Sequence, residues 1–333
     1  MKKLLNDPND AVDEMVEGIV AAHPQYLRQL DSHPRAVVRA DAPVQGKVGI
    51  LIGGGSGHEP TFIGYVGKGL ADAVAVGNVF ASPPPDPAYE ASKAIDGGAG
   101  VVYLYGNYAG DVMNFDMAAE MCAMDDIAVE TVLVTDDVAS APRAEREKRR
   151  GVAGDVFVFK CAGAAADLLY DQAAVVRTAH KANDACLTMG VALESCSLPQ
   201  TGEPTFSLGP DEMEIGLGIH GEPGVRRGRL ESADSVIDNM LDMIFAEMPL
   251  GAEDSVAVLV NGLGSTTLME QYVAFRRVHQ RLTERGTRMH SRLIGSYCTS
   301  LEMGGLSVTL LQLDDELTRL IDHPADCVMF RQA

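Results

Sequence analysis

The sequence has 333 residues, of which 46% are hydrophobic, and a formal net charge of −20. This length predicts about two domains with sizeable cores, and the apolar content excludes a disordered chain. The charge argues against nucleic acid or an anionic membrane as a partner. No apolar run is long enough for a transmembrane helix, and MKKLLNDPND lacks a signal-peptide core. We therefore expect a cytoplasmic protein whose six scattered cysteines are reduced and mostly buried.

The first half of the chain alternates helical and strand patterns. Residues 10–23 have apolar side chains at helical spacing and predict an amphipathic helix with Asp10 as its cap. Helix-compatible stretches such as 88–95 and 115–124 then separate apolar, β-branched segments. These predicted strands are 48–52, 73–76, 101–105, 129–134 and 156–159. The alternation is typical of a largely parallel sheet with helices on both faces.

An alanine-rich, helix-like stretch at 171–190 separates this series from a second one. The predicted strands of the second series are 191–194, 214–219, 256–260, 292–296 and 306–311. We predict an α/β protein with two domains, each a mostly parallel or mixed sheet flanked by helices. The predicted boundary lies near residue 183, which gives an N-terminal domain of residues 1–182 and a C-terminal domain of residues 183–333.

A glycine-rich stretch, GGGSGHEP at 53–60, directly follows the apolar run VGILI. It does not match a dinucleotide-binding motif, because His58 stands where a glycine is required. It has no P-loop lysine, and Phe62 stands where an HExxH zinc motif needs histidine. Glycines after a strand can present backbone N–H groups to a small, oxygen-rich ligand. The alternative is a tight turn in which His58 is a capping or buried residue.

Two more motifs carry candidate functional residues. GLGIHGEPG at 216–224 repeats the pattern of a histidine followed by Glu-Pro. NYAGDVMNF follows the strand predicted at 101–105, which places Asp111 at the carboxyl edge of a sheet. Asp111 is a candidate general base and also a candidate helix N-cap. No GxSxG elbow is present, which argues against an α/β hydrolase.

Six motifs in this order resemble the substrate-binding (K) subunit family of dihydroxyacetone kinase, over essentially the whole chain. They are GGGSGHEP, NYAGDVMNF, RRGVAG with KCAGAAAD, GIHGEPG, VNGLGSTTLMEQY and GSYCTSLEMGGLSVTLLQLDDE. The resemblance implies that His220 bonds covalently to the carbonyl carbon of a ketone, forming a hemiaminal. It implies that Asp111 accepts the proton of the attacking hydroxyl and that His58 binds substrate and assists proton transfer. The implied substrate contacts are the backbone of Gly55, Ser56 and Gly57, together with Ser82.

One position departs from the family pattern. The family usually has lysine just before the NY of this motif, and this chain has Gly106. The pocket then accepts a longer ketose such as erythrulose, or another residue supplies the missing donor. A third reading is a non-catalytic relative that senses a ketone and regulates. Asp111 favours the enzyme, because a sensor needs no general base.

The resemblance also predicts the partners. The sequence has no nucleotide signature and no metal-ligand spacing, and ADP or ATP with Mg²⁺ is expected on a separate L subunit or a fused domain. A phosphotransferase (M) subunit is a further possible partner, and a homodimer is expected. The cluster of Arg226, Arg227 and Arg229 is either a solvated turn or a surface that faces the nucleotide phosphates of the L subunit. The basic run at 143–150 is interpreted as a solvated helix or loop end with a weaker claim to partner docking.

Overall fold

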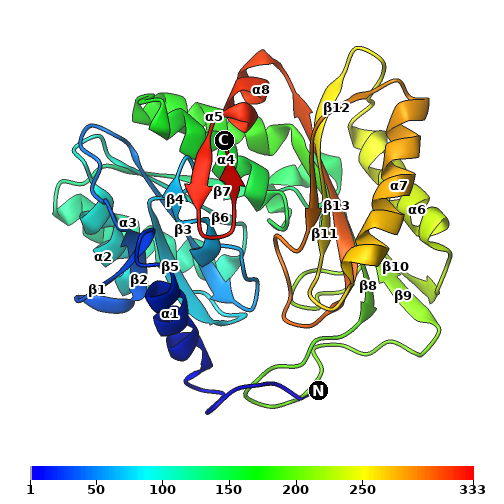
Figure 1. Ribbon diagram of the computed structural model, residues 1–333, viewed down its shortest axis with the longest axis horizontal. Coiled ribbons are helices and arrows are strands. Elements are labelled where there is room, and N and C mark those ends of the chain that lie inside the picture. The colour runs from blue at the N-terminus through cyan, green and yellow to red at the C-terminus, as the bar shows by residue number, and fades with distance from the viewer. Residues whose placement is uncertain (1) are drawn as a thin grey trace. The chain divides into compact units, whose positions relative to one another are not determined.

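The computed structural model describes residues 2–333, and it divides into two compact units, neither of which is continuous in sequence (Figure 1). The first unit comprises the described residues up to Val134, Val158–Lys181 and Arg319–Ala333. The second comprises Thr135–Phe157 and Ala182–Thr318. The single boundary near residue 183 therefore does not describe this exchange of segments, which sequence periodicity cannot reveal because it depends on which distant segments pack together.

The first unit contains a six-stranded sheet in the order β1-β2-β5-β3-β6-β7. β3, β5, β6 and β7 run parallel, while β2 pairs antiparallel with both β1 and β5. β3 and β6 are buried along almost their whole lengths, as expected for parallel strands covered on both faces. The strands are β1 (Leu27–Leu30), β2 (His33–Arg39), β3 (Gly49–Ser56), β5 (Ala73–Val79), β6 (Val101–Gly106) and β7 (Val129–Val134).

Three helices of the first unit pack on this sheet. α1 (Ala11–Ala22) contacts the antiparallel edge formed by β1 and β2. α2 (Pro85–Ile95) and α3 (Ala109–Met124) pack against each other, α2 over β2, β5 and β3 and α3 over β6 and β7. The helix predicted at 10–23 is confirmed, although the side chain of Asp10 makes no capping hydrogen bond.

The strand predicted at 156–159 is wrong, because these residues lie in the helix α4 (Asp155–Asp167). Residues 155–166 are buried without a break, so the segment lacks the polar face that distinguishes a surface helix from a strand. The helix-like stretch at 171–190 divides into α5 (Gln172–Asp184) and the start of the strand β8 (Cys186–Glu194).

The end of the chain completes the first unit. β14 (Ala325–Cys327) pairs with β15 (Arg331–Gln332) and with β4 (Gly67–Lys68), which follows the short helix η1 (Ile63–Tyr65). Just before them, α8 (Asp315–Asp322) ends beside the buried Lys160. The Lys160 ammonium donates to the carbonyl oxygens of Leu320 and His323 at 2.9 and 2.6 Å. Burial lowers the pKa of Lys160 to about 8.

The second unit also has a six-stranded sheet, in the order β10-β9-β8-β13-β11-β12. Only β11 and β12 are parallel, and every other neighbouring pair is antiparallel. The sheet is therefore mixed, which the alternation of strands and helices in the sequence does not distinguish from a parallel one. Its other strands are β9 (Glu212–Ile215), β10 (Arg226–Arg229), β11 (Ser255–Gly262), β12 (Arg288–Gly295) and β13 (Gly304–Leu313).

Alternate residues of this second sheet face different layers. Met189, Val258 and Val308 belong to the core covered by α6 (Ala233–Glu247) and α7 (Leu268–Glu284). Thr188, Ser307 and Asn261 line a space on the side of Val152 and Ala153. Because side chains alternate along a strand, the helices cover one face and the segment Thr135–Phe157 approaches the other.

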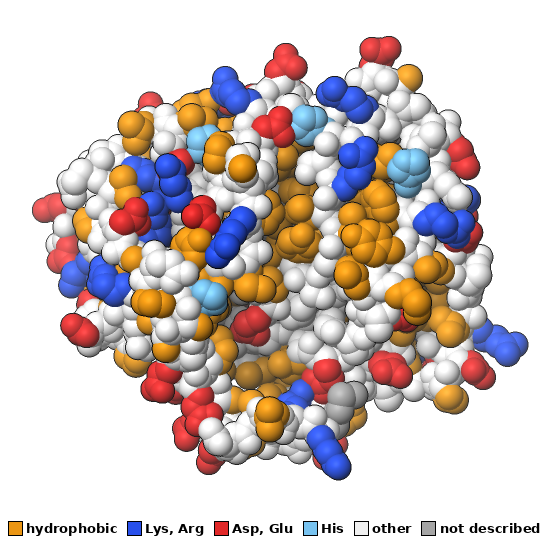
Figure 2. Space-filling view, viewed as in Figure 1, with side chains coloured by type: hydrophobic (Ala, Val, Ile, Leu, Met, Phe, Trp, Pro, Cys, Tyr) orange, Lys and Arg blue, Asp and Glu red, His pale blue; other side chains and the backbone are white. Residues whose placement is uncertain are grey.

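No helix among residues 2–333 is both long and apolar enough to cross a bilayer. All six cysteines are buried thiols without disulfide bonds. Carboxylate side chains are dispersed over the face in Figure 2 and do not form a single patch.

Substitution of Gly163 in α4 tests the close packing of this helix against the backbone of Leu70 in the first unit. A β-carbon there would lie 2.2 Å from the carbonyl oxygen of Leu70, an atom of the backbone. Gly163→Ala is expected to lower the free energy of unfolding by about 1–3 kcal/mol through overpacking, as measured by urea denaturation. Gly18→Ala in α1 is the matched control, because a β-carbon there would have nothing within 4 Å. This exposed helical position should gain about 0.5–1 kcal/mol, and equal effects of the two variants would contradict the packing.

Candidate functional site

The glycine-rich motif begins as a strand. Gly53 to Ser56 continue β3, with an irregularity in the pairing between Gly54 and Ser56. A β-carbon on Gly54 would lie 2.5 Å from the ring of Phe62, and one on Gly55 would lie 2.8 Å from the backbone nitrogen of Ala81. Glycine is therefore required here by the close approach of neighbouring segments, whether or not a ligand binds.

Two polar groups of this motif have partners within the first unit, and one of them, the Gly57 amide, is a predicted oxygen-binding group. The Ser56 hydroxyl donates to the carbonyl of Gly77 at 2.8 Å. The Gly57 amide donates to the carboxylate of Glu59 at 3.0–3.2 Å, and burial raises the pKa of that carboxyl group. A substrate oxygen at Gly57 would consequently have to replace Glu59.

His58 is buried, with 3% of its surface exposed. Its ring stacks on Phe80 with the centroids 5.0 Å apart and the planes at 18°. Phe80 has a left-handed backbone with φ of 53°, which is unusual for a large side chain. Stacking holds the imidazole plane of His58 in a defined orientation, and Phe80 is a residue that the sequence analysis did not single out.

Asp111 lies in the first turn of α3, where Tyr108 is the N-cap, so the N-cap interpretation of Asp111 is wrong. It is buried, and the positive end of the helix dipole favours a carboxylate at this place. One turn later, Asn114 donates to the hydroxyl of Ser82 at 3.2 Å. The structure thus brings Ser82 to the first turns of α3, and Gly106 lies at the end of the preceding strand, β6. Asn114 could be found from its spacing of three residues after Asp111.

His220 belongs to the second unit, in the loop between β9 and β10. Its Nδ1 lies 2.9 Å from Oε1 of Glu222, and its backbone N–H donates to Oε2 of the same carboxylate at 2.9 Å. Its side chain is 24% exposed. Burial acts to raise the pKa of Glu222, but the hydrogen bond and charge of His220, a backbone amide and Arg150 together lower it to about 2. Glu222 is the third residue of a His-x-Glu pattern, His220-Gly221-Glu222, that is visible in the sequence.

Arg150 lies between the carboxylates of Glu222 and Asp137 and faces both. Its Nε and Nη2 contact Oδ2 of Asp137 at 2.9 and 2.8 Å, and its Nη1 is 3.7 Å from Oε2 of Glu222. Burial raises the pKa of Asp137 to about 6, although Arg150 acts in the opposite direction. A β-carbon on Gly218 would lie 2.2 Å from Oε2 of Glu222 and 2.3 Å from Nη1 of Arg150. Glycine at this position makes room for the carboxylate and the guanidinium.

The basic run at 143–150 is therefore only partly solvated. Lys148 is exposed, but Arg149 is completely buried and pairs with the carboxylate of Glu247 at 2.6–2.9 Å. The interpretation as a solvated helix or loop end is wrong for Arg149 and Arg150. A buried, paired arginine cannot be recognised from composition, because its carboxylate partner is distant in sequence.

The arginine cluster after His220 forms an edge strand and not a turn. Arg226, Arg227 and Arg229 lie on β10, which pairs antiparallel with β9. Arg227 contacts Glu214 at 2.8 Å, and Arg226 pairs with Glu231. Glu214 also accepts from the amide of Gly224 and so connects this strand to the end of the histidine motif.

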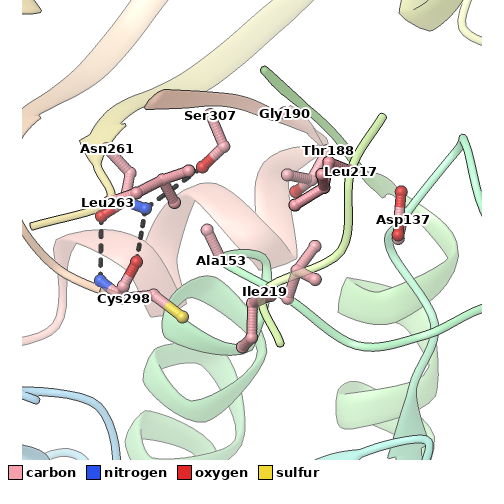
Figure 3. A pocket seen from close by; sticks show the side chains of 11 residues that line it. Asp137, Ala153, Thr188, Gly190, Leu217, Ile219, Asn261, Leu263, Cys298 and Ser307 are labelled. Carbon is pink, nitrogen blue, oxygen red and sulfur yellow. Dashed lines mark hydrogen bonds between the residues drawn. The ribbon is translucent and has the colours of Figure 1, made fainter. Parts of the chain in front are cut away.

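A small cavity lies beside the His220 loop (Figure 3). Its volume is about 20 Å³, which suffices for one water molecule and not for a ketose. Asn261 fixes one wall by donating to the carbonyl of Cys298 at 2.7 Å and to Ser307 at 3.1 Å. Leu217 and Ile219 form part of another wall, and the carbonyl of Ile219 accepts from Ser300. The backbone just before His220 is thus bonded to the segment between β12 and β13.

The described residues 2–333 include no group of three or more His, Cys, Asp or Glu side chains that could hold a metal ion. The first unit combines glycine-rich strand ends, an oriented histidine and a buried carboxylate at a helix start. The second presents a histidine held by a carboxylate. These are features of an α/β protein that binds a small oxygenated molecule and carries out acid–base or nucleophilic chemistry.

Comparison with known proteins identifies the family. A sequence model described as the Dak1 domain matches residues 17–329. The chain is 51% identical, over 99% of both chains, to the "PTS-dependent dihydroxyacetone kinase 2, dihydroxyacetone-binding subunit DhaK" of Listeria innocua. The chain therefore belongs to the Dak1 family, that of the dihydroxyacetone kinase K subunits, as the resemblance predicted.

Other relatives define the breadth of this kinase family. The dihydroxyacetone kinase of C. freundii has a similar structure, with a TM-score of 0.91 and 33% identity, over 99% of this chain and 60% of that one. The "D-erythrulose kinase" of Mycolicibacterium smegmatis is 43% identical over all of this chain and 57% of its own length. The "Dihydroxyacetone kinase operon co-activator Dha-DhaQ" has a TM-score of 0.88 and 29% identity, over 96% of this chain and 98% of that one.

The lowered pKa of Glu222 predicts an acid-dependent stability. A carboxyl group whose pKa falls from 4.5 to about 2 on folding stabilises the protein above pH 4.5, and this contribution is lost as the pH falls towards 2. Urea unfolding of Glu222→Gln should show the largest deficit near neutral pH and a shrinking deficit below pH 4.5. Glu231→Gln, which removes another arginine-paired carboxylate of the same unit, is the control. A Glu222→Gln deficit that does not change with pH would refute the assignment.

Proposed function

We propose that this chain is the ketone-binding subunit of a dihydroxyacetone (glycerone) kinase and captures its substrate as a hemiaminal on His220. The observation that supports this most directly is the contact between Nδ1 of His220 and Glu222. A ring held at Nδ1 has Nε2 as the nitrogen with which it would attack a carbonyl carbon. Family membership supplies the substrate class, since the K subunits that this chain matches are named as dihydroxyacetone-binding.

Covalent capture would give chemical selectivity. A ketone can form the adduct, whereas glycerol has no carbonyl and cannot. The adduct would also fix the terminal hydroxyl of the ketose, and phosphoryl transfer depends mainly on positioning and charge stabilisation.

The residues of the first unit have separate roles in this proposal. Asp111 is the base that accepts the proton of the attacking hydroxyl, and it lies in the first turn of α3, where the positive end of the helix dipole favours a carboxylate. His58 binds the substrate and assists proton transfer during hemiaminal formation. The backbones of Gly55, Ser56 and Gly57, with Ser82 and the space at Gly106, are the substrate contacts. Binding at Gly57 includes displacement of Glu59.

Phosphoryl transfer is assigned to a partner. ADP or ATP with Mg²⁺ would be bound by an L subunit, which ATP or a phosphotransferase (M) subunit recharges. The chain alone would then bind a ketone and transfer no phosphate. The edge strand β10, with its exposed arginines, is a candidate surface for the nucleotide phosphates of the L subunit. A homodimer in the cytoplasm remains the expected state.

Gly106, which replaces the lysine usual in the family, leaves the identity of the ketose substrate open. A four-carbon ketose such as erythrulose is a second candidate, favoured by the missing lysine and by 43% identity to a D-erythrulose kinase. A ketone-sensing regulator is a third candidate, favoured by the structural similarity to an operon co-activator. Asp111 supports the kinase roles over the sensor, because sensing requires no general base.

Covalent capture can be observed directly by carbon NMR. Carbonyl-labelled dihydroxyacetone and erythrulose, each mixed with the purified chain, should convert a carbonyl signal into that of a tetrahedral carbon. His220→Ala should abolish this signal, because no other residue is assigned the bond. The ketose that forms the adduct at the lower concentration is the better substrate candidate. A tetrahedral signal that persists in His220→Ala, or none in the wild type, would contradict the proposal.

Asp111→Asn separates ketone binding from phosphoryl transfer. The variant should form the NMR-detected adduct like the wild type, but its turnover with an L subunit and phosphate donor should fall about 10²–10⁴-fold. Asp116→Asn, on the exposed side of the same helix, should retain turnover. Full turnover by Asp111→Asn would exclude Asp111 as the base.

A further inference from the structure

The two oxygens of Glu222 have different partners, and this difference defines the state of His220. Oε2 accepts from the backbone N–H of His220, a group that can only donate. Oε1 faces Nδ1 of the same residue at 2.9 Å. An ionised carboxylate is only an acceptor, so a hydrogen bond at Nδ1 requires that Nδ1 carry the hydrogen.

We infer that Glu222 is a positioning residue that holds His220 in the Nδ1–H tautomer and balances the positive charge that the ring acquires when Nε2 bonds to the ketone. This inference rests on the proposed function, because it assigns a role in the same capture step. The low pKa of Glu222 supports it, since the carboxyl group stays ionised at neutral pH.

The bond changes in the step show why a carboxylate is suited to this place. The lone pair of Nε2 forms a bond to the carbonyl carbon, and the π electrons of the C=O bond move to oxygen. The oxygen takes a proton from water, which leaves hydroxide, or from His58, the residue proposed to assist proton transfer. The ring is now substituted at Nε2 and protonated at Nδ1, so it is a cation. Glu222 is too weak a base to remove that proton, and it therefore stabilises the cation as an ion pair.

A second layer of charge holds Glu222 in place. Asp137 fixes the guanidinium of Arg150, and Nη1 of Arg150 faces Oε2 of Glu222 at 3.7 Å. Only a glycine at position 218 leaves space for both groups. The loop sequence G-I-H-G-E thus supplies the histidine, its carboxylate and the room for the cation behind the carboxylate.

The test is nitrogen NMR of the chain labelled at histidine, with the ring in its neutral form and the His220 signals assigned by comparison with His220→Ala. The wild type should carry its hydrogen on Nδ1. In Glu222→Gln, the backbone N–H of His220 binds the amide oxygen, so the NH₂ group faces Nδ1. Nδ1 must then be the acceptor, the hydrogen moves to Nε2, and the reactive lone pair is lost.

The matching functional measurement is the ketone concentration required for the carbon NMR adduct. It should rise about ten- to a hundredfold in Glu222→Gln, through loss of a charge-assisted hydrogen bond. Glu231→Gln should match the wild type in both measurements. An Nε2–H tautomer in the wild type, or a wild-type tautomer and affinity in Glu222→Gln, would overturn the inference.

Gly218→Ala tests the same arrangement without touching either partner. Its β-carbon would displace only the side-chain ends of Glu222 and Arg150 and no backbone atom, so the fold should persist. The Nδ1–H preference and the adduct affinity should both decrease. Gly228→Ala, where a β-carbon has nothing within 4 Å, should change neither. Wild-type behaviour of Gly218→Ala would overturn the role of the second layer.

The nitrogen NMR and carbon NMR measurements together distinguish this inference from the proposed function. If the wild type forms no adduct, the proposed function fails and the charge-balancing role fails with it. The tautomer is still decided by the nitrogen spectra, which require no ketone.

Discussion

Close approach between segments, possible only where a residue lacks a β-carbon, shapes both loops that carry the candidate functional residues. At the end of β3, Gly54 lies against the ring of Phe62 and Gly55 against the backbone of Ala81. In the second unit, Gly218 lies against Glu222 and Arg150. Such contacts leave little freedom to the side chains that follow them. His58 and His220 are consequently oriented by the packing of their own units, before any ligand is considered.

The sequence reveals the regular elements well where a strand or helix has a clear period. The buried runs at β3, β6 and β11 and the amphipathic α1 are all visible as patterns. α4 is not, because it is buried all round and contains VFVF, which favours a strand by composition. The mixed pairing of the second sheet and the exchange of segments between the units are also invisible, since they depend on contacts between distant residues.

The site is predictable to the extent that residue type reports chemistry. A histidine after a glycine-rich strand end and an aspartate after a buried strand both stand out in the sequence. The roles of the neighbouring residues Arg150 and Glu222 are not evident from the sequence. Arg150 sits in a run of charges that reads as solvated, yet it is held by Asp137, and whether Glu222 turns back towards its own histidine depends on the conformation of the loop. Family resemblance assigns roles to the histidines and the aspartate of the motifs. Only the structure reveals the contacts of their neighbours, Glu222 and Arg150.

The first unit is built from segments that are far apart in the sequence, and this affects how it folds during synthesis. Its strand β4 pairs with β14, and the buried ammonium of Lys160 is bonded by carbonyl groups near the end of α8. These partners follow the whole of the second unit in the sequence, so the ribosome makes them after that unit. Until then the nascent first unit exposes an unpaired strand edge and has a cation without its acceptors, both of which disfavour a finished core. Domains usually fold in the order of synthesis, but here the first unit can be completed only after the second unit has been synthesised.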